Sequence, residues 1–245
     1  MISPLQEAFS MQNEPGGEPA HDTAAVTSAL EADVRSTIAK GGDVKRAVQN
    51  LTLQKLSEKN HDLESLGRIM TAVIQGAREG AQQQVKETSA QTQASLAQIT
   101  DAVAGLDAAL AQLAEASKLA VEEAAGRAQK FSREELARAR TDLESLGALC
   151  MDTLKVSASA AKGAVADTLH DLLAHAKRNG TAVGSQMKDT LTVIAHQMTL
   201  VGHTQLREGM HFTQATAELM RKIAAGVLTG IAERVKPDDK AGETR

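Results

Sequence analysis

The sequence predicts an all-α protein, an elongated bundle of long amphipathic helices in antiparallel hairpins with coiled-coil-like packing. Pro4, Pro15 and Pro19 lie near the start and Pro237 near the end, and residues 20–236 contain no proline. Because proline breaks helices and this stretch is rich in Ala, Leu, Glu, Gln and Lys, it reads as nearly continuous helix. The chain has no Trp, no Tyr and three Phe. Strands favour aromatic residues, so their scarcity also favours helix-on-helix packing.

Hydrophobic side chains recur at alternating spacings of three and four residues, which is the pattern of a coiled-coil seam. One such seam consists of Leu96, Ile99, Val103, Leu106, Leu110 and Leu113. A second consists of Met187, Leu191, Ile194, Met198 and Val201. Because long isolated helices are unstable, these seams must pack on one another, on a second copy of the chain, or on an apolar surface.

Three regions follow from the distribution of proline and charge. Residues 1–20 are expected to be a disordered acidic arm, because acidic residues precede the first basic one, Arg35. The helical domain is expected to span residues 21–236. The polar residues 237–245 are expected to be a disordered tail.

Capping signals divide the domain into helices. Gly41 and Gly42 followed by Asp43 predict the end of one helix and the start of the next. The string KNHD at residues 59–62 is a softer break. Ser132 and Glu135 match a capping box, and the string RNGT, just before residue 182, is another pair of caps. The predicted helices are about 22–40, 43–59, 62–130, 132–178 and 182–235, of which the third would be roughly 100 Å long.

The string DLESLG occurs twice, at residues 62–67 and 142–147. Other identities recur at the same 80-residue spacing, which suggests an internal duplication of a helical unit. Two leucines on one helix face, followed by a glycine that lets a second helix come close, make each copy a packing module. The residues concerned are Leu63, Leu66, Gly67, Leu143, Leu146 and Gly147. We therefore interpret the string as a structural unit used twice, and not as a binding motif.

No pattern of residues in the sequence is typical of catalysis, cofactor binding or metal binding. His196 and His203 share a helix face, but two turns place them roughly 10 Å apart, so they do not predict a metal site. Cys150 is the sole cysteine, and it is expected to be a small buried hydrophobe and not a nucleophile. The sequence thus predicts a non-enzymatic protein with no cofactor.

Two glycine pairs at a spacing of four residues predict close approach between helices. They are Gly76 with Gly80 and Gly226 with Gly230. Neither pair resembles a phosphate-binding loop, because no strand precedes it and no Lys-Ser or Lys-Thr follows. The second pair lies in KIAAGVLTGIAERV (222–235), an apolar segment that is too short to span a bilayer but suited to docking on a partner or lying in an interface.

Charge and hydropathy limit the partners and the location. A net charge of −4 and a pI near 6.0 argue against a general nucleic-acid binder. No stretch predicts a transmembrane helix, and the start of the sequence has no features of a secretory signal. A single cysteine fits a reducing compartment, so we expect a cytoplasmic protein.

Three stretches carry a resemblance: GLDAALAQLAEASKLAVEEAAGRAQKF (105–131), LLAHAKRNGTAVG (172–184) and IAAGVLTGIAERV (223–235). They resemble an uncharacterised family of proteobacterial all-helical proteins, a domain of unknown function, which implies no activity or site residues. In its acidic, aromatic-poor, Ala/Gln/Thr-rich helices the chain is also similar to the phasins. That likeness implies a bacterial protein that coats polyester storage granules.

Three functions are compatible with these observations. The first is a non-catalytic, phasin-like coat of an apolar granule or lipid surface. The alternative is a self-associating coiled-coil scaffold or adaptor that binds other proteins and forms an oligomer. Self-association would use the DLESLG leucines and glycines, the seam of residues 96–113, and the pair Gly226 and Gly230. The third, an enzyme or ligand-binding bundle, requires polar groups that converge in a buried pocket.

Overall fold

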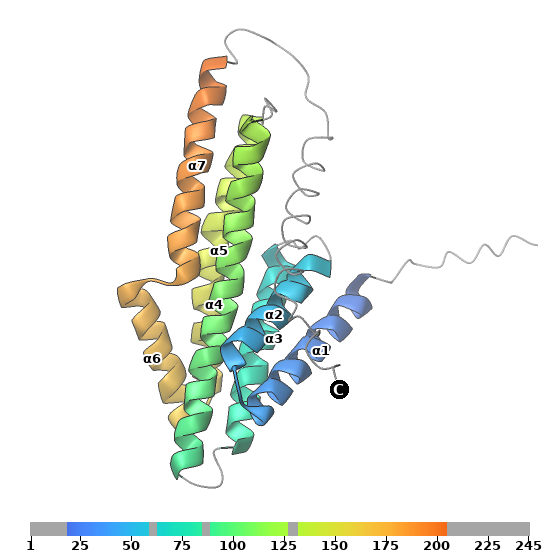
Figure 1. The fold of residues 1–245 in the computed structure, drawn as a ribbon, viewed down its shortest axis with the longest axis vertical. Coiled ribbons are helices and arrows are strands. Elements are labelled where there is room, and N and C mark those ends of the chain that lie inside the picture. The colour runs from blue at the N-terminus through green and yellow to red at the C-terminus, as the bar shows by residue number, and fades with distance from the viewer. Residues whose placement is uncertain (1–18, 59–62, 85–88, 127–131, 205–245) are drawn as a thin grey trace, which may run out of the picture.

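The computed structural model describes residues 19–58, 63–84, 89–126 and 132–204. Over these residues the chain forms helices and no strands, which confirms the all-α prediction (Figure 1). The helices are α1 (Pro19–Lys40), α2 (Val44–Glu58), α3 (Leu63–Gln84), α4 (Ser89–Gly126), α5 (Arg133–Ala160), α6 (Gly163–Asn179) and α7 (Ala182–Thr204). The side chains of the first turns of α1 and the last turn of α7 lie outside the described part.

The helices form an elongated bundle around α4, which is about 57 Å long at 1.5 Å per residue. Helices α2, α3, α6 and α7 pack against α4, while α1 packs mainly on α3, and α5 contacts α3, α6 and α7. In Figure 1, α1–α3 lie together on one side of α4, and α6 and α7 follow its other side. One hydrophobic core runs from Leu30 of α1 to Ile194 of α7. The described helices are therefore parts of a single packed unit.

Three of the predicted caps are present. Gly41 and Gly42 have φ of 71° and 87° after α1, and the Asp43 carboxylate accepts a hydrogen bond from the Arg46 amide at 3.0 Å. Ser132 and Glu135 form a complete capping box at the start of α5. Each of these devices satisfies backbone groups that a helix end leaves unpaired, which is why the sequence located the breaks correctly.

The third cap lies between α6 and α7. Gly180, with φ of 77°, ends α6, and its amide donates to the Ala176 carbonyl. The Thr181 hydroxyl then accepts a hydrogen bond from the Gly184 amide at 3.0 Å. The chain therefore breaks here instead of bending through as one helix.

The prediction of one helix over 62–130 is wrong, because α3 and α4 are separate helices that pack on each other. The Ser95 hydroxyl donates to the Gln84 side-chain oxygen at 2.9 Å, whereas eleven residues along one helix would separate the two positions by about 16 Å. Gln84 also donates to the Ile38 carbonyl at the end of α1. Residues 85–88, between α3 and α4, are Val, Lys, Glu and Thr and include no Gly or Pro, so composition gave no sign of this reversal.

The prediction of one helix over 132–178 is also wrong. Helix α5 ends at Ala160, the next residue Ala161 is extended, and α6 starts at Gly163, where φ is +57°. This is a left-handed backbone conformation that glycine adopts at little cost. The predicted last helix, 182–235, is described only as far as Thr204.

Both predicted seams pack within the chain. Ile99, Leu106 and Leu110 are at most 1% exposed, and Leu96, Val103 and Leu113 are half-buried against the same core. In α7, Met187 and Ile194 are buried in the same core, while Leu191 and Met198 are half-buried against it and Val201 lies beyond the described side chains. The sequence left three possible partners for these seams: other helices of the chain, a second copy, or an apolar surface. In the structure, other helices of the same chain cover most of the length of both seams.

The closest helix contacts are made by glycines outside the DLESLG string. A Cβ atom added at Gly76 would collide with the Glu31 carbonyl oxygen of α1, and one at Gly80 would lie 2.8 Å from Cβ of Ile38. The pair at 76 and 80 thus allows close approach, as predicted. Gly105 likewise allows α4 and α2 to approach closely, because an added Cβ atom would collide with the Lys45 carbonyl oxygen. Gly226 and Gly230 lie outside the described residues.

Candidate functional site

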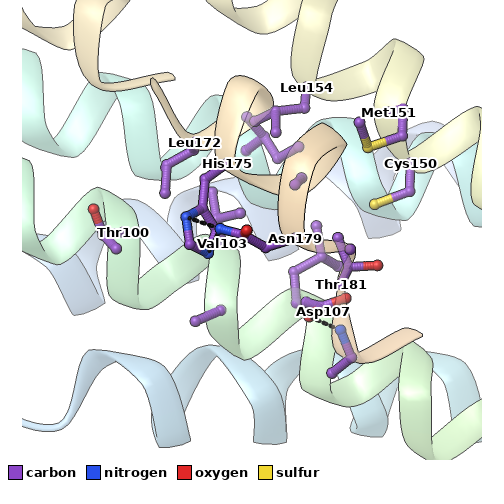
Figure 2. A pocket seen from close by; sticks show the side chains of 16 residues that line it. Thr100, Val103, Asp107, Cys150, Met151, Leu154, Leu172, His175, Asn179 and Thr181 are labelled. Atoms are coloured by element: carbon purple, nitrogen blue, oxygen red, sulfur yellow. Dashed lines mark hydrogen bonds between the residues drawn. The ribbon is translucent and has the colours of Figure 1, made fainter. Parts of the chain in front are cut away.

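A cavity of about 500 Å³ lies where α6 and the α6–α7 turn cross α4 and α5 (Figure 2). Its volume falls within the range of about 300–1,000 Å³ that is typical of small-molecule pockets. Most of the lining is apolar. The lining residues are Ile74, Thr100, Val103, Ala104, Leu106, Asp107, Cys150, Met151, Leu154, Leu172, His175, Ala176, Asn179, Gly180, Thr181 and Ala182.

One wall of the cavity is fixed by a carboxylate that caps a distant helix. Asp107 of α4 accepts hydrogen bonds from the Ala182 amide at 2.7 Å and from the Val183 amide at 3.0 Å. These amides belong to the first turn of α7, where backbone N–H groups have no partner within the helix and the dipole favours negative charge. The contact therefore holds the start of α7 against the middle of α4.

The lining combines buried apolar side chains with exposed polar ones. Ile74, Leu106 and Leu154 are at most 4% exposed and are the most buried of the lining residues. His175 and Asn179 are exposed, and the Asn179 side-chain nitrogen lies 2.9 Å from Nδ1 of His175 (Figure 2). The cavity thus has buried apolar walls, and we call the exposed part of its lining, at His175 and Asn179, its mouth.

Cys150 lies in the cavity wall. Burial, followed in importance by the charge of Asp107, raises the pKa of the Cys150 thiol from 9.0 to about 11. A nucleophilic cysteine needs a lowered pKa, since the thiolate is the reactive form. The half-buried position agrees with the expectation of a small packed side chain.

The raised pKa of Cys150 predicts slow alkylation of the folded protein. A rise from 9.0 to about 11 reduces the thiolate fraction at neutral pH roughly 100-fold, partly offset by the higher nucleophilicity of a more basic thiolate. Iodoacetamide should therefore react roughly 10- to 100-fold more slowly with the native chain than with the chain in urea. The stability that the protonated thiol contributes should be complete below pH 9 and lost as the pH rises through 11. Equal native and denatured rates would contradict this placement of Cys150.

A second hollow is an open groove of about 520 Å³ between α5 and α7. It is lined by Arg140, Leu143, Glu144, Gly147, Gly184, Met187, Lys188, Leu191, Thr192 and Ala195. Leucines and Met187 form the floor, and the charged residues are exposed at the rim. The groove is the more open of the two hollows described here.

The two DLESLG copies lie in different surroundings. Leu63 and Leu66 are half-buried at the start of α3, whereas Leu143 and Leu146 are buried within α5. A Cβ atom at Gly67 would lie 3.3 Å from a methyl group of Leu149, so the first copy lies against the helix that carries the second. At Gly147 the nearest atom would be Cε of Met187, at 3.6 Å. Of the two hollows described above, the groove is lined by Leu143 and Gly147 of the second copy, and neither hollow is lined by the first copy.

The histidines are not brought together into a metal site in the part of the chain that the structure describes. His170, His175 and His196 are exposed, and no group of three His, Cys, Asp or Glu side chains clusters among the described residues. The side chain of His203 and the whole of His211 lie outside them. None of the described helices is long and apolar enough to cross a bilayer.

Sequence reasoning missed both hollows. The cavity depends on Asp107 and Ala182, which are 75 residues apart and carry no shared motif. The only available signal was that a new helix begins after the cap pair before residue 182, so that the first N–H groups of this helix need an acceptor.

Comparison with known proteins gives one match. No curated protein and no solved structure matches the chain. A family model described as "Family of unknown function (DUF6781)" matches residues 20–237, which is most of the sequence. This range includes every helix described above except the first residue of α1, so the cavity and the groove both lie inside it. The chain belongs to the DUF6781 family.

Proposed function

We propose that this protein is a non-catalytic helical scaffold that associates with a second copy of itself through the groove between α5 and α7. The observation that carries the proposal is the stripe that each helix contributes to this groove. On α5 the lining residues are spaced i, i+3, i+4 and i+7 from Arg140 to Gly147. On α7 the same spacing begins at Gly184 and continues to Ala195. Such paired stripes are the surface against which a further helix packs.

The shape of the groove suits a helix as its occupant. Gly184 is exposed and has no side chain, which allows an incoming helix to approach the α7 wall closely. Leu143, Met187 and Leu191 supply an apolar floor, and burying them further would stabilise the complex.

The charges at the rim favour a second copy as the partner. Arg140 and Glu144 form an ion pair on α5, with Nε of Arg140 2.8 Å from the Glu144 carboxylate, and Lys188 lies on the opposite wall. A two-fold axis brings the same patch of two chains together. The mixed rim can then pair the Glu144 of one chain with the Lys188 of the other, whereas a rim of one charge would repel its own copy.

The test is the mass of the full chain in solution, measured by light scattering at tens of micromolar. We expect a defined dimer or higher oligomer. Ala195→Glu places a charged side chain in the groove and should shift the mass to that of a monomer. Ala148→Glu is the matched control, because Ala148 is an exposed alanine of α5 outside the groove, and it should leave the mass unchanged. A monomeric wild-type chain, or equal behaviour of the two variants, would rule the proposal out.

The phasin-like coat is a second candidate, supported by the apolar segment 222–235 and by the likeness to phasins. Among the described side chains the large exposed hydrophobics are Leu119, Val156 and Leu200, so the coat would depend on this segment or on opening of the bundle. Flotation with granules or liposomes, with and without residues 222–235, tests it, and absence of the full chain from the floating fraction would exclude it. A bacterial cytoplasmic location is part of the same proposal and rests on the family resemblance and the single cysteine.

A further inference from the structure

We propose that the cavity between α4, α5 and α6 binds a neutral, mostly apolar small molecule that carries one hydrogen-bonding group. This inference is independent of the scaffold function, because the cavity and the groove share no lining residue. The cavity, of about 500 Å³, receives side chains from α4, α5 and α6, as Figure 2 shows, and Ile74 from α3. A site built from so many elements is a property of the whole bundle and not of one surface turn.

The walls are held in place without a ligand. The α6–α7 turn forms one edge, and it is fixed at both ends: Gly180 donates to the Ala176 carbonyl, and Asp107 accepts from the first amides of α7. The Thr100 hydroxyl donates to the Leu96 carbonyl within α4. A preformed site binds without the cost of ordering its own side chains, so it favours a ligand that fits the existing space.

The charges of the lining favour a neutral ligand. Among the sixteen lining residues there is one carboxylate, that of Asp107, and no Lys or Arg. An anion would therefore lose its hydration without gaining a positive partner, and it would be repelled by Asp107. A cation gains little, because the carboxylate already accepts two N–H bonds at the positive end of α7.

The position of the polar groups indicates how the ligand lies. The buried side chains of Ile74, Leu106 and Leu154 offer only apolar contacts, which suit a hydrocarbon or aromatic body. At the mouth, the exposed His175 ring and the Asn179 amide can bond to a hydroxyl, amine or carbonyl group. The ligand is thus expected to enter with its apolar end first and to leave its polar group at the mouth.

The test uses three naphthalene probes that differ in charge. Neutral N-phenyl-1-naphthylamine should bind the full chain at one saturable site with an increase in fluorescence. The anionic sulfonate analogue, 8-anilinonaphthalene-1-sulfonate, and the cationic N-(1-naphthyl)ethylenediamine should each bind at least about ten-fold more weakly. Equal or tighter binding of either charged probe would overturn the proposal.

Two further measurements locate the bound probe. Ala176→Leu fills the cavity and should weaken binding of the neutral probe about ten-fold, whereas Ala174→Leu, at a half-buried position of the same helix outside the lining, should not. The same comparison can be made on α4, where Ala104 lies in the lining and Ala108 does not, so Ala104→Leu should weaken binding and Ala108→Leu should not. This second pair replaces the first if Ala176→Leu or Ala174→Leu lowers the melting temperature. Saturating probe should also slow the reaction of Cys150 with 4,4′-dithiodipyridine. If the filling variants leave the affinity for the neutral probe unchanged, or if the probe leaves the rate of Cys150 modification unchanged, the probe binds elsewhere and the site is refuted.

Discussion

Gly105→Ala is expected to destabilise the bundle by about 2 kcal/mol or more. The added Cβ atom would collide with the Lys45 carbonyl oxygen and would lie 3.2 Å from Cβ of Val48, so α2 and α4 would have to move apart. The obstacle is backbone, which cannot rotate away as a side chain can. The gain in helix propensity from Gly to Ala, about 1 kcal/mol, offsets only part of this cost. The measurement is the free energy of unfolding from urea titration followed by circular dichroism.

Gly147→Ala is the matched control, because it introduces the same atom into a helix with a different neighbour. Its Cβ atom would lie 3.6 Å from Cε of Met187, which is an ordinary van der Waals contact with a flexible side chain. The variant should therefore be as stable as the wild type or more stable, by up to about 1 kcal/mol. If both variants change stability in the same direction by similar amounts, the close approach of α2 and α4 is wrong.

Asp107→Ala is expected to cost about 2 kcal/mol of stability, and the loss should be concentrated at the start of α7. The substitution removes the acceptor of two hydrogen bonds, at 2.7 and 3.0 Å, and leaves the amides of Ala182 and Val183 without that partner. Hydrogen exchange of these two amides should accelerate more than exchange in α4 itself. Urea unfolding gives the global change, and amide exchange followed by NMR gives the local one.

Asp101→Ala separates the loss of this cap from the loss of a negative charge on α4. Asp101 is exposed and lies six residues before Asp107 on the same helix. Substitution of an exposed residue of this kind usually changes stability by no more than about 0.5 kcal/mol. Equal effects of the two substitutions would show that the contact between Asp107 and α7 contributes nothing specific.

The sequence predicted those features of the fold that depend on neighbouring residues. The glycines at 41 and 42, the capping box at Ser132 and Glu135, and the turn at Gly180 are local signals, and each marks a helix end in the structure. The two missed helix ends show the limit of this reasoning. The reversal after Gln84 has no glycine or proline, and it is held by contacts with Ser95 and Ile38 that exist only once the helices pack. The break before Gly163 does contain a glycine, but one glycine inside an apparently helical stretch is a weak signal.

The candidate site was much less predictable than the helices. Periodicity identified Leu106 and Leu110 as seam residues, and the structure places both in the core. It could not predict that Asp107, between them in the same helix, would cap a helix 75 residues later. In the same way, the two copies of DLESLG are identical in sequence, yet the second lines a groove and the first does not.

Composition and capping by themselves determined that this protein is helical, which residues face a core, and where most of its helices end. These properties follow from backbone hydrogen bonding and the 3.6-residue period, which act over a few residues. The tertiary structure alone decided which helices are partners, which glycines permit backbone contact, and where space remains between the helices. Those outcomes depend on the sum of side-chain volumes brought together from distant segments, because an alanine-rich face can pack against many similar faces.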